Sequence, residues 1–321
     1  MTIDYFRQLK GQPQAVELLQ QAISKNRVAT AYLFVGPFGV GRSLGAKCFS
    51  EALLCVDLVP ERQELVAKRI TQGNHPDLLW VEPTYQHQGQ LITVQEAIKL
   101  GIKRKTLPQI RIEQIREITR FLNRPPLEAS RSLVIIESAQ SMTEAAANGL
   151  LKTLEEPGKA TLILIAPNVD NLLSTLVSRC QKIPFYRLSK EDLIAVLNEQ
   201  KQEEISKNLE ILDLAQGSPG EAIAIAEKLQ SIPQEILHQS KQLPRSILEG
   251  FDLAKNVSQT LDSETQLWLI NYLQYFYWKQ LQNKKLLERL EKAKKHLLSY
   301  VQSRLVWECL LIEIIRHQKS F

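Results

Sequence analysis

One segment of the sequence has the residue types and spacing of a phosphate-binding loop. Residues 36–43 read Gly-Pro-Phe-Gly-Val-Gly-Arg-Ser and stand between a short apolar run and a helical pattern. In such loops backbone amides at a helix start bind phosphate, and a lysine supplies charge at the β- and γ-phosphates. Arg42 occupies the lysine position; it keeps the charge but is longer and planar. The candidate nucleotide-binding residues are Gly36, Gly39, Gly41, Arg42 and Ser43.

The ligand expected at this loop is ATP or ADP, and a glycine-rich turn without any ligand is the alternative. The full spacing between a strand and a helix indicates descent from a nucleotide-binding fold. It leaves open whether the loop still holds a nucleotide.

The acidic residues that would support nucleotide hydrolysis are altered as well. This chemistry requires an Asp at the end of a buried strand to hold Mg²⁺, and a Glu usually follows it. The corresponding apolar run, 132–136, is followed by Glu137 and Ser138. Glu137 can approach a metal through its longer side chain, whereas the Ser138 hydroxyl has no negative charge with which to act as a general base. We therefore expect that this chain has lost ATP hydrolysis.

The elements that must position these residues predict a parallel α/β domain over 1–188. Short apolar runs bounded by polar turns alternate with helical patterns there, as in βαβ folds. The predicted strands lie at 33–35, 79–81, 132–136 and 162–165.

The rest of the chain is predicted to be helical. Residues 189–192, Ser-Lys-Glu-Asp, have the pattern of a capping box, and Gly-Ser-Pro-Gly at 217–220 separates two helices of a small lid domain over 189–230. From 231 to 321 the apolar residues keep helical spacing. The last helix, at about 301–317, is apolar on more than one side and therefore requires neighbours.

Composition and cysteine usage indicate an ordinary globular protein of the cytoplasm. The chain has 321 residues, 44% of them hydrophobic, and a net charge of +5, which fits an acidic partner without specifying one. Four scattered cysteines, Cys48, Cys55, Cys180 and Cys309, form no disulfide framework. No apolar leader is visible at the N-terminus and no run of about 18 uncharged apolar residues occurs, so we expect no membrane span.

Two further segments are similar to the bacterial clamp-loader subunits of DNA polymerase III, which are AAA+ proteins. Residues 145–157 resemble the helix that follows the acidic strand in that family, and Ser178-Arg179-Cys180 looks like its SRC motif. The resemblance extends over residues 1 to about 230. It implies an AAA+ domain with a RecA-like sheet, a helical lid and, over 231–321, a helical collar for oligomerisation.

Within the family, the chain is most similar to the delta-prime type, which keeps SRC while its own nucleotide site decays. Motor subunits carry the loop lysine, an Asp-Glu pair and an arginine in the lid. This chain departs from them at Arg42, at Glu137 with Ser138, and at 217–221, where no arginine occurs.

The resemblance implies that Arg179 is an arginine finger that acts in trans on ATP held by a gamma- or tau-type motor subunit. A guanidinium suits this role because it stays charged and can bind two phosphate oxygens. The implied partners are motor subunits and a delta subunit in a hetero-pentamer, which loads the sliding clamp on primed DNA. Two other functions fit: an active AAA+ ATPase, and a scaffold in which Arg179 only pairs with a carboxylate or caps a helix.

Two family comparisons concern the region after the phosphate loop. Family members hold a four-cysteine zinc module there, but only Cys55 stands near a ligand position, so we expect no zinc and expect Cys48 and Cys55 to be buried. Residues 84–109 look like an insertion. Its basic triplet, Lys103, Arg104 and Lys105, can contact DNA phosphate or form a solvated loop.

Overall fold

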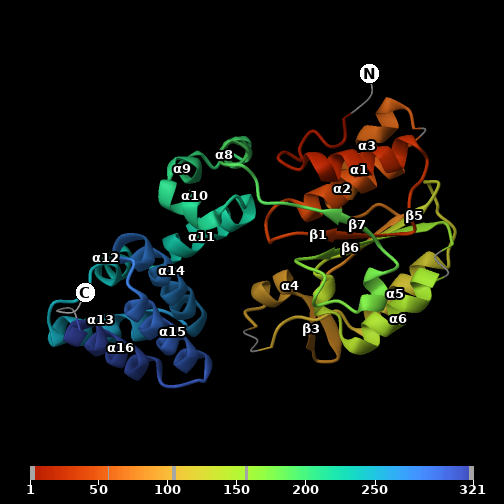
Figure 1. The fold of residues 1–321 in the computed structure, drawn as a ribbon. Coiled ribbons are helices and arrows are strands. Elements are labelled where there is room, and N and C mark those ends of the chain that lie inside the picture. Colours follow the sequence, from red (N-terminus) through yellow and green to blue (C-terminus); the bar gives the residue numbers. More distant parts are fainter. Residues whose placement is uncertain (1–3, 57, 103–105, 156–157, 318–321) are drawn as a thin grey trace. The chain divides into compact units, whose positions relative to one another are not determined.

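The computed structural model describes residues 4–56, 58–102, 106–155 and 158–317 (Figure 1). The chain forms two compact units, Met1–Glu221 and Ala222–Phe321, which are described in turn. The border between them falls inside one helix, α11 (Pro219–Ser231). The domain limits at 188 and 230 stay predictions.

The first unit is built on a five-stranded parallel sheet with the strand order β2-β5-β6-β1-β7. The predicted α/β class and the four predicted strands are confirmed. The strands are β1 (Ala31–Val35), β2 (Leu78–Val81), β5 (Ser132–Ile136), β6 (Ala160–Ala166) and β7 (Gln181–Pro184). The edge strand β7 was not predicted, because Gln181 and Lys182 are exposed and polar.

Both faces of this sheet are covered by helices, which explains why its central strands are apolar throughout. Successive side chains of β1 alternate between the faces: Leu33 belongs to the core beneath α5 and α6, whereas Tyr32 and Phe34 contact Phe49 of α2. Figure 1 shows α5 and α6 on one side of the sheet and α1 and α2 on the other.

The helices of the first unit before the lid lie at the following bounds: α1 (Pro13–Ser24), α2 (Arg42–Leu54), α3 (Pro60–Gln72), α4 (Val94–Lys99), α5 (Ile112–Leu122), α6 (Glu144–Glu155) and α7 (Ser174–Val177). A short 3-10 turn, Ala139–Ser141, follows β5. The predicted helix at 145–157 is α6, and Pro157 lies outside the described residues.

The lid segment has the predicted helical character. It contains α8 (Lys190–Glu199), α9 (Glu203–Lys207), α10 (Leu209–Ala215) and the start of α11. Ser189 Oγ accepts a hydrogen bond from the Asp192 backbone N at 3.1 Å, which is the forward half of the predicted capping box. As predicted, the chain breaks between two helices, α10 and α11, but the break is residues 216–218, and Pro219 and Gly220 already belong to the first turn of α11.

The second unit is helical, as predicted. Besides the rest of α11 it contains α12 (Gln234–Lys241), α13 (Ile247–Thr260), α14 (Ser263–Leu281), α15 (Lys284–Leu298) and α16 (Ser303–His317). The last helix is anchored by the buried Trp307, whose indole N–H donates to Gln266 Oε1 at 3.0 Å. Within the described part of the chain, none of the helices has the length and apolar character needed to span a bilayer.

Candidate functional site

The phosphate loop has the backbone shape that its glycines predict. It leaves β1 and enters α2 at Arg42, with φ of 72° at Gly39 and 101° at Gly41, values at which only glycine is free of strain. Gly36 is required for another reason. A Cβ atom there would lie 2.3 Å from the carbonyl oxygen of Phe185, which follows β7. The loop glycines are therefore required by the local backbone and its packing, whether or not the loop binds a ligand.

The start of α11 and the residue before it, Ser218, pack directly on the phosphate loop, within the first unit. Gly220 N donates to Gly39 O at 3.0 Å, and Ser218 Oγ donates to Phe38 O at 2.8 Å. A Cβ atom on Gly39 would lie 2.7 Å from Gly220 Cα. The two backbones thus approach as closely as glycine allows.

Arg42, Ser43 and Glu137 come together at the carboxyl ends of β1 and β5. Ser43 Oγ donates to Glu137 Oε1 at 2.8 Å. Burial raises the pKa of the Glu137 carboxyl, against the lowering effects of the Ser43 hydrogen bond and the Arg42 charge. Burial likewise lowers the pKa of Arg42, and the neighbouring Glu137 opposes this shift. The three side chains form one electrostatically coupled group.

This group has the oxygen donors that a nucleotide-bound Mg²⁺ requires. A hydroxyl and one carboxylate are typical protein ligands of Mg²⁺, with phosphate supplying further oxygens. Two buried polar atoms, Glu137 Oε2 and Arg42 Nη1, have no hydrogen-bond partner in the described residues. The residues present therefore fit a metal-phosphate group, although Ser138 supplies no carboxylate for activating water.

Arg179 lies on a different element and contacts other residues. It follows the short helix α7, where its Nη1 donates to Thr175 O at 3.1 Å and its Nη2 forms an ion pair with Glu155 Oε1 at 3.0 Å. Its side chain is 40% exposed. Among the described residues, no hydrogen bond or ion pair joins Arg179 to Arg42, Ser43 or Glu137. The structure thus does not bring Arg179 into this chain's own loop site.

The other members of the SRC motif have structural surroundings. Ser178 Oγ donates to the Thr175 carbonyl at 3.1 Å, so it caps the end of α7. Burial raises the pKa of the Cys180 thiol to about 11, which keeps it protonated at neutral pH.

Two residues that tie the site together were not predicted as site residues. The Gln12 amide donates to the carbonyl oxygens of Val40 and Tyr186 and accepts from Tyr186 N at 2.9 Å, so it joins the phosphate loop to the segment after β7. Arg187 Nη1 donates to Ala215 O and pairs with Glu221 Oε2 at 3.0 Å. Gln12 lies in the part of the chain over which the family resemblance extends, but the sequence alone assigned neither residue a role.

The predicted insertion at 84–109 contains ordered structure. Strands β3 (Thr84–His87) and β4 (Gln90–Thr93) form an antiparallel hairpin that leads into α4, and two backbone hydrogen bonds between Thr84 and Gln109 close its base. These strands were not predicted, because their sequences are mostly polar. Lys103, Arg104 and Lys105 lie outside the described residues.

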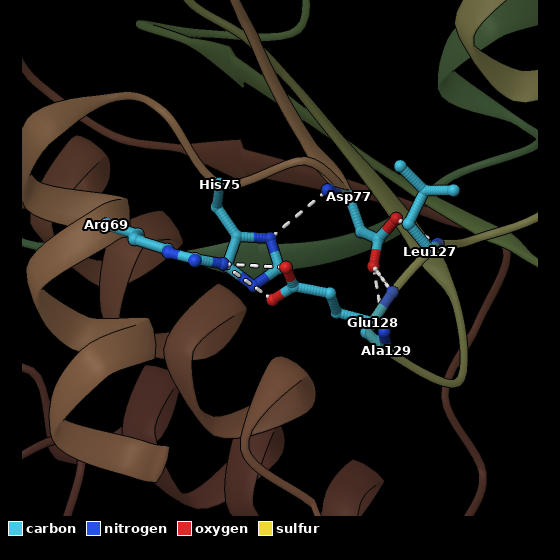
Figure 2. Close-up of polar contacts among 6 residues, drawn as sticks. All are labelled: Arg69, His75, Asp77, Leu127, Glu128 and Ala129. Atoms are coloured by element: carbon cyan, nitrogen blue, oxygen red, sulfur yellow. Dashed lines mark hydrogen bonds and ion pairs between the residues drawn. The ribbon is translucent and has the colours of Figure 1, made fainter.

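A buried polar cluster lies at the opposite, amino-terminal ends of β2 and β5. The Asp77 carboxylate accepts hydrogen bonds from three successive backbone amides, those of Leu127, Glu128 and Ala129, at 2.6–2.8 Å (Figure 2). The neutral His75 ring accepts from Asp77 N through Nδ1 at 3.1 Å. The cluster joins the start of β2 to the loop before β5, and a surface ion pair between Arg69 and Glu128 lies beside it.

Cys48 and Cys55 are buried, as predicted, and burial raises the pKa of both thiols to about 11. In the described residues, no group of three or more His, Cys, Asp and Glu side chains is arranged to hold a metal ion.

Two protein families match nearly consecutive parts of the chain. The family described as "DNA polymerase III, delta subunit" matches residues 11–189, and the family "Cyanobacterial DNA polymerase III delta prime, C-terminal domain" matches residues 191–314.

Individual relatives agree with these families. The chain is 35% identical over 203 residues to DNA polymerase III subunit delta' of Bacillus subtilis, covering 62% of this chain and 55% of that protein. It is 31% identical over 215 residues to subunit delta' of Pseudomonas aeruginosa, covering 64% and 58%. The matches therefore span a little over half the length of these two relatives.

A solved structure has the same fold. It is that of a DNA polymerase III gamma subunit-related protein from Thermotoga maritima, which is 20% identical, with a TM-score of 0.52 and coverage of 94% of this chain and 99% of that one. Together with the parallel sheet, the phosphate loop and the helical C-terminal region, these matches show that the chain belongs to the delta-prime family of DNA polymerase III clamp-loader subunits, with the AAA+ fold.

Proposed function

We propose that this chain is a non-motor subunit of a clamp loader and supplies Arg179 in trans to ATP bound by a neighbouring gamma- or tau-type subunit. The position of Arg179 carries this proposal. Its side chain is partly exposed and follows a short helix, and among the described residues it forms no hydrogen bond or ion pair with Arg42, Ser43 or Glu137. An arginine so placed can bind an anion held by another subunit.

The chain's own site supports a role without turnover. Arg42 replaces the loop lysine, and Ser138 replaces the carboxylate that would activate water. Binding of ATP or ADP by Gly36, Gly39, Gly41, Arg42, Ser43 and Glu137 is compatible with this role. A bound nucleotide would supply the phosphate oxygens that complete a Mg²⁺ site, without turnover by this chain.

The proposed partners are the motor subunits and a delta subunit in a hetero-pentamer, with the helical segment 231–321 as the collar. The assembly would place the sliding clamp on primed DNA. Four free cysteines in the chain fit the reducing cytoplasm as its compartment.

The test compares ATP turnover by the purified chain with turnover by its complex with the motor subunit. Alone, the chain should hydrolyse ATP at a negligible rate. In the complex, Arg179→Ala should remove turnover at the site that the arginine serves, since arginine fingers contribute roughly 10³–10⁵-fold in GTPases. Assembly, measured by size-exclusion chromatography, should be unchanged.

Arg69→Ala is the matched control, because Arg69 also forms a partly exposed ion pair with a glutamate in the same unit. It should leave turnover unchanged. Robust hydrolysis by the isolated chain would instead support the active-ATPase alternative, and full turnover in the Arg179→Ala complex would support the scaffold alternative.

A further inference from the structure

Arg179 is held at two points, and both belong to well-packed elements. Glu155 is the last residue of α6, a helix whose Leu150 is fully buried against the sheet. Thr175 lies in α7, where the neighbouring Leu176 is 1% exposed. Both contacts therefore start from well-packed helices, and they restrict the rotamers of the arginine relative to those of a free side chain.

This arrangement leaves the guanidinium able to bind a second anion. An arginine has five N–H donors and remains charged under all relevant conditions. The bonds to Glu155 Oε1 and Thr175 O each require only one of these donors. About three donors then remain for phosphate oxygens, and the ion pair can persist while a phosphate is bound.

The stability of α6 does not explain a glutamate at this position. The carboxyl end of a helix carries partial negative charge, so an acidic side chain in the last turn is unfavourable. The Glu155 side chain is also 57% exposed, so it contributes little packing. The favourable contact of the Glu155 charge is therefore its ion pair with Arg179.

We propose that Glu155 is a positioning residue for Arg179: it orients the guanidinium before the neighbouring subunit presents its nucleotide. This inference rests on the proposed role of Arg179 in trans. It predicts that removal of the Glu155 carboxylate slows turnover. If the contact instead kept the arginine away from the nucleotide, removal of the carboxylate would speed turnover.

The experiment uses the complex with the motor subunit and measures DNA-stimulated ATP turnover. Glu155→Ala should lower kcat by about two- to five-fold, the range expected for loss of one partly exposed ion pair, with KM for ATP unchanged. Glu155→Gln keeps an acceptor oxygen at the same position and should retain most of the rate. Glu128→Ala, which removes the comparable pair with Arg69, should have no effect.

A double-mutant cycle gives the decisive result. In the Arg179→Ala background, Glu155→Ala should cause no further loss, because its only effect on turnover passes through the arginine. The melting temperature of Glu155→Ala should equal or exceed that of the parent chain. A higher rate in Glu155→Ala, or equal losses with and without Arg179, overturns the inference. If Arg179→Ala itself has no effect, the proposed function fails instead.

Discussion

Replacement of Asp77 by alanine should destabilise the first unit strongly, although Asp77 lies at the amino-terminal end of the strands, opposite the phosphate loop. Its side chain is buried, with 2% of the residue exposed, and accepts three backbone hydrogen bonds. Asp77 O also accepts from Leu133 N at 2.8 Å, where the pairing of β2 with β5 begins. The carboxylate therefore fastens the loop before β5 to the start of β2.

The magnitude follows from these contacts. A hydrogen bond to a charged group contributes about 1.5–3 kcal/mol, so three bonds amount to at least about 4.5 kcal/mol. Part of this free energy is recovered in the variant, because water can reach the freed amides. The loop that carries them lies at the surface, where Leu127 is 78% exposed. We expect a net loss of about 3 kcal/mol in the free energy of unfolding, or about 6–12 °C in melting temperature.

Hydrogen exchange measured by mass spectrometry is the appropriate assay, because the two units need not unfold together. A loss of about 3 kcal/mol corresponds to roughly 100-fold faster exchange in peptides that cover β2 and β5. Peptides from α14, in the second unit, serve as the internal reference. Glu128→Ala should change exchange by less than tenfold, because it removes only a surface ion pair. Equal protection in Asp77→Ala and the parent chain would refute this reasoning.

Two further predictions concern the same unit. Burial lowers the pKa of His75 below its ordinary 6.5, so the unfolded state takes up the proton first as pH falls. Stability should therefore decline below about pH 6.5, and His75→Asn should flatten this decline in denaturant titrations. Gly39→Ala should cost at least about 1 kcal/mol more than Gly89→Ala in the same titrations: both glycines have positive φ, but a Cβ atom on Gly89 meets no atom within 4 Å. Equal costs would contradict the packing argument.

The sequence predicts elements well where local patterns determine them. The central strands are apolar because both faces of the sheet are covered, and the phosphate loop has the spacing of its motif. The edge strand β7 was missed because Gln181 and Lys182 face solvent. The hydrogen bond between Ser43 and Glu137 is as expected for a parallel sheet, because the carboxyl ends of its strands lie at the same end of the sheet.

Other contacts could not be predicted, because they join a side chain to backbone groups far away along the chain. The amides that bind Asp77 lie about 50 residues along the chain from it and have no side-chain signature. The contacts of Gln12 with Tyr186 have the same character. For Arg179, the sequence left both a role in trans and a carboxylate partner open, and the structure identifies that carboxylate as Glu155.

The close approach of Gly39 and Gly220 also affects how such loops evolve. Each glycine leaves no room for a side chain on the other, so either position can change only if the backbone of its partner moves away. Across related chains, substitutions at these two positions should therefore be correlated. Packing alone is thus sufficient to retain Gly39 in the phosphate loop. The glycine spacing of such a loop can therefore persist after selection for nucleotide binding has ended.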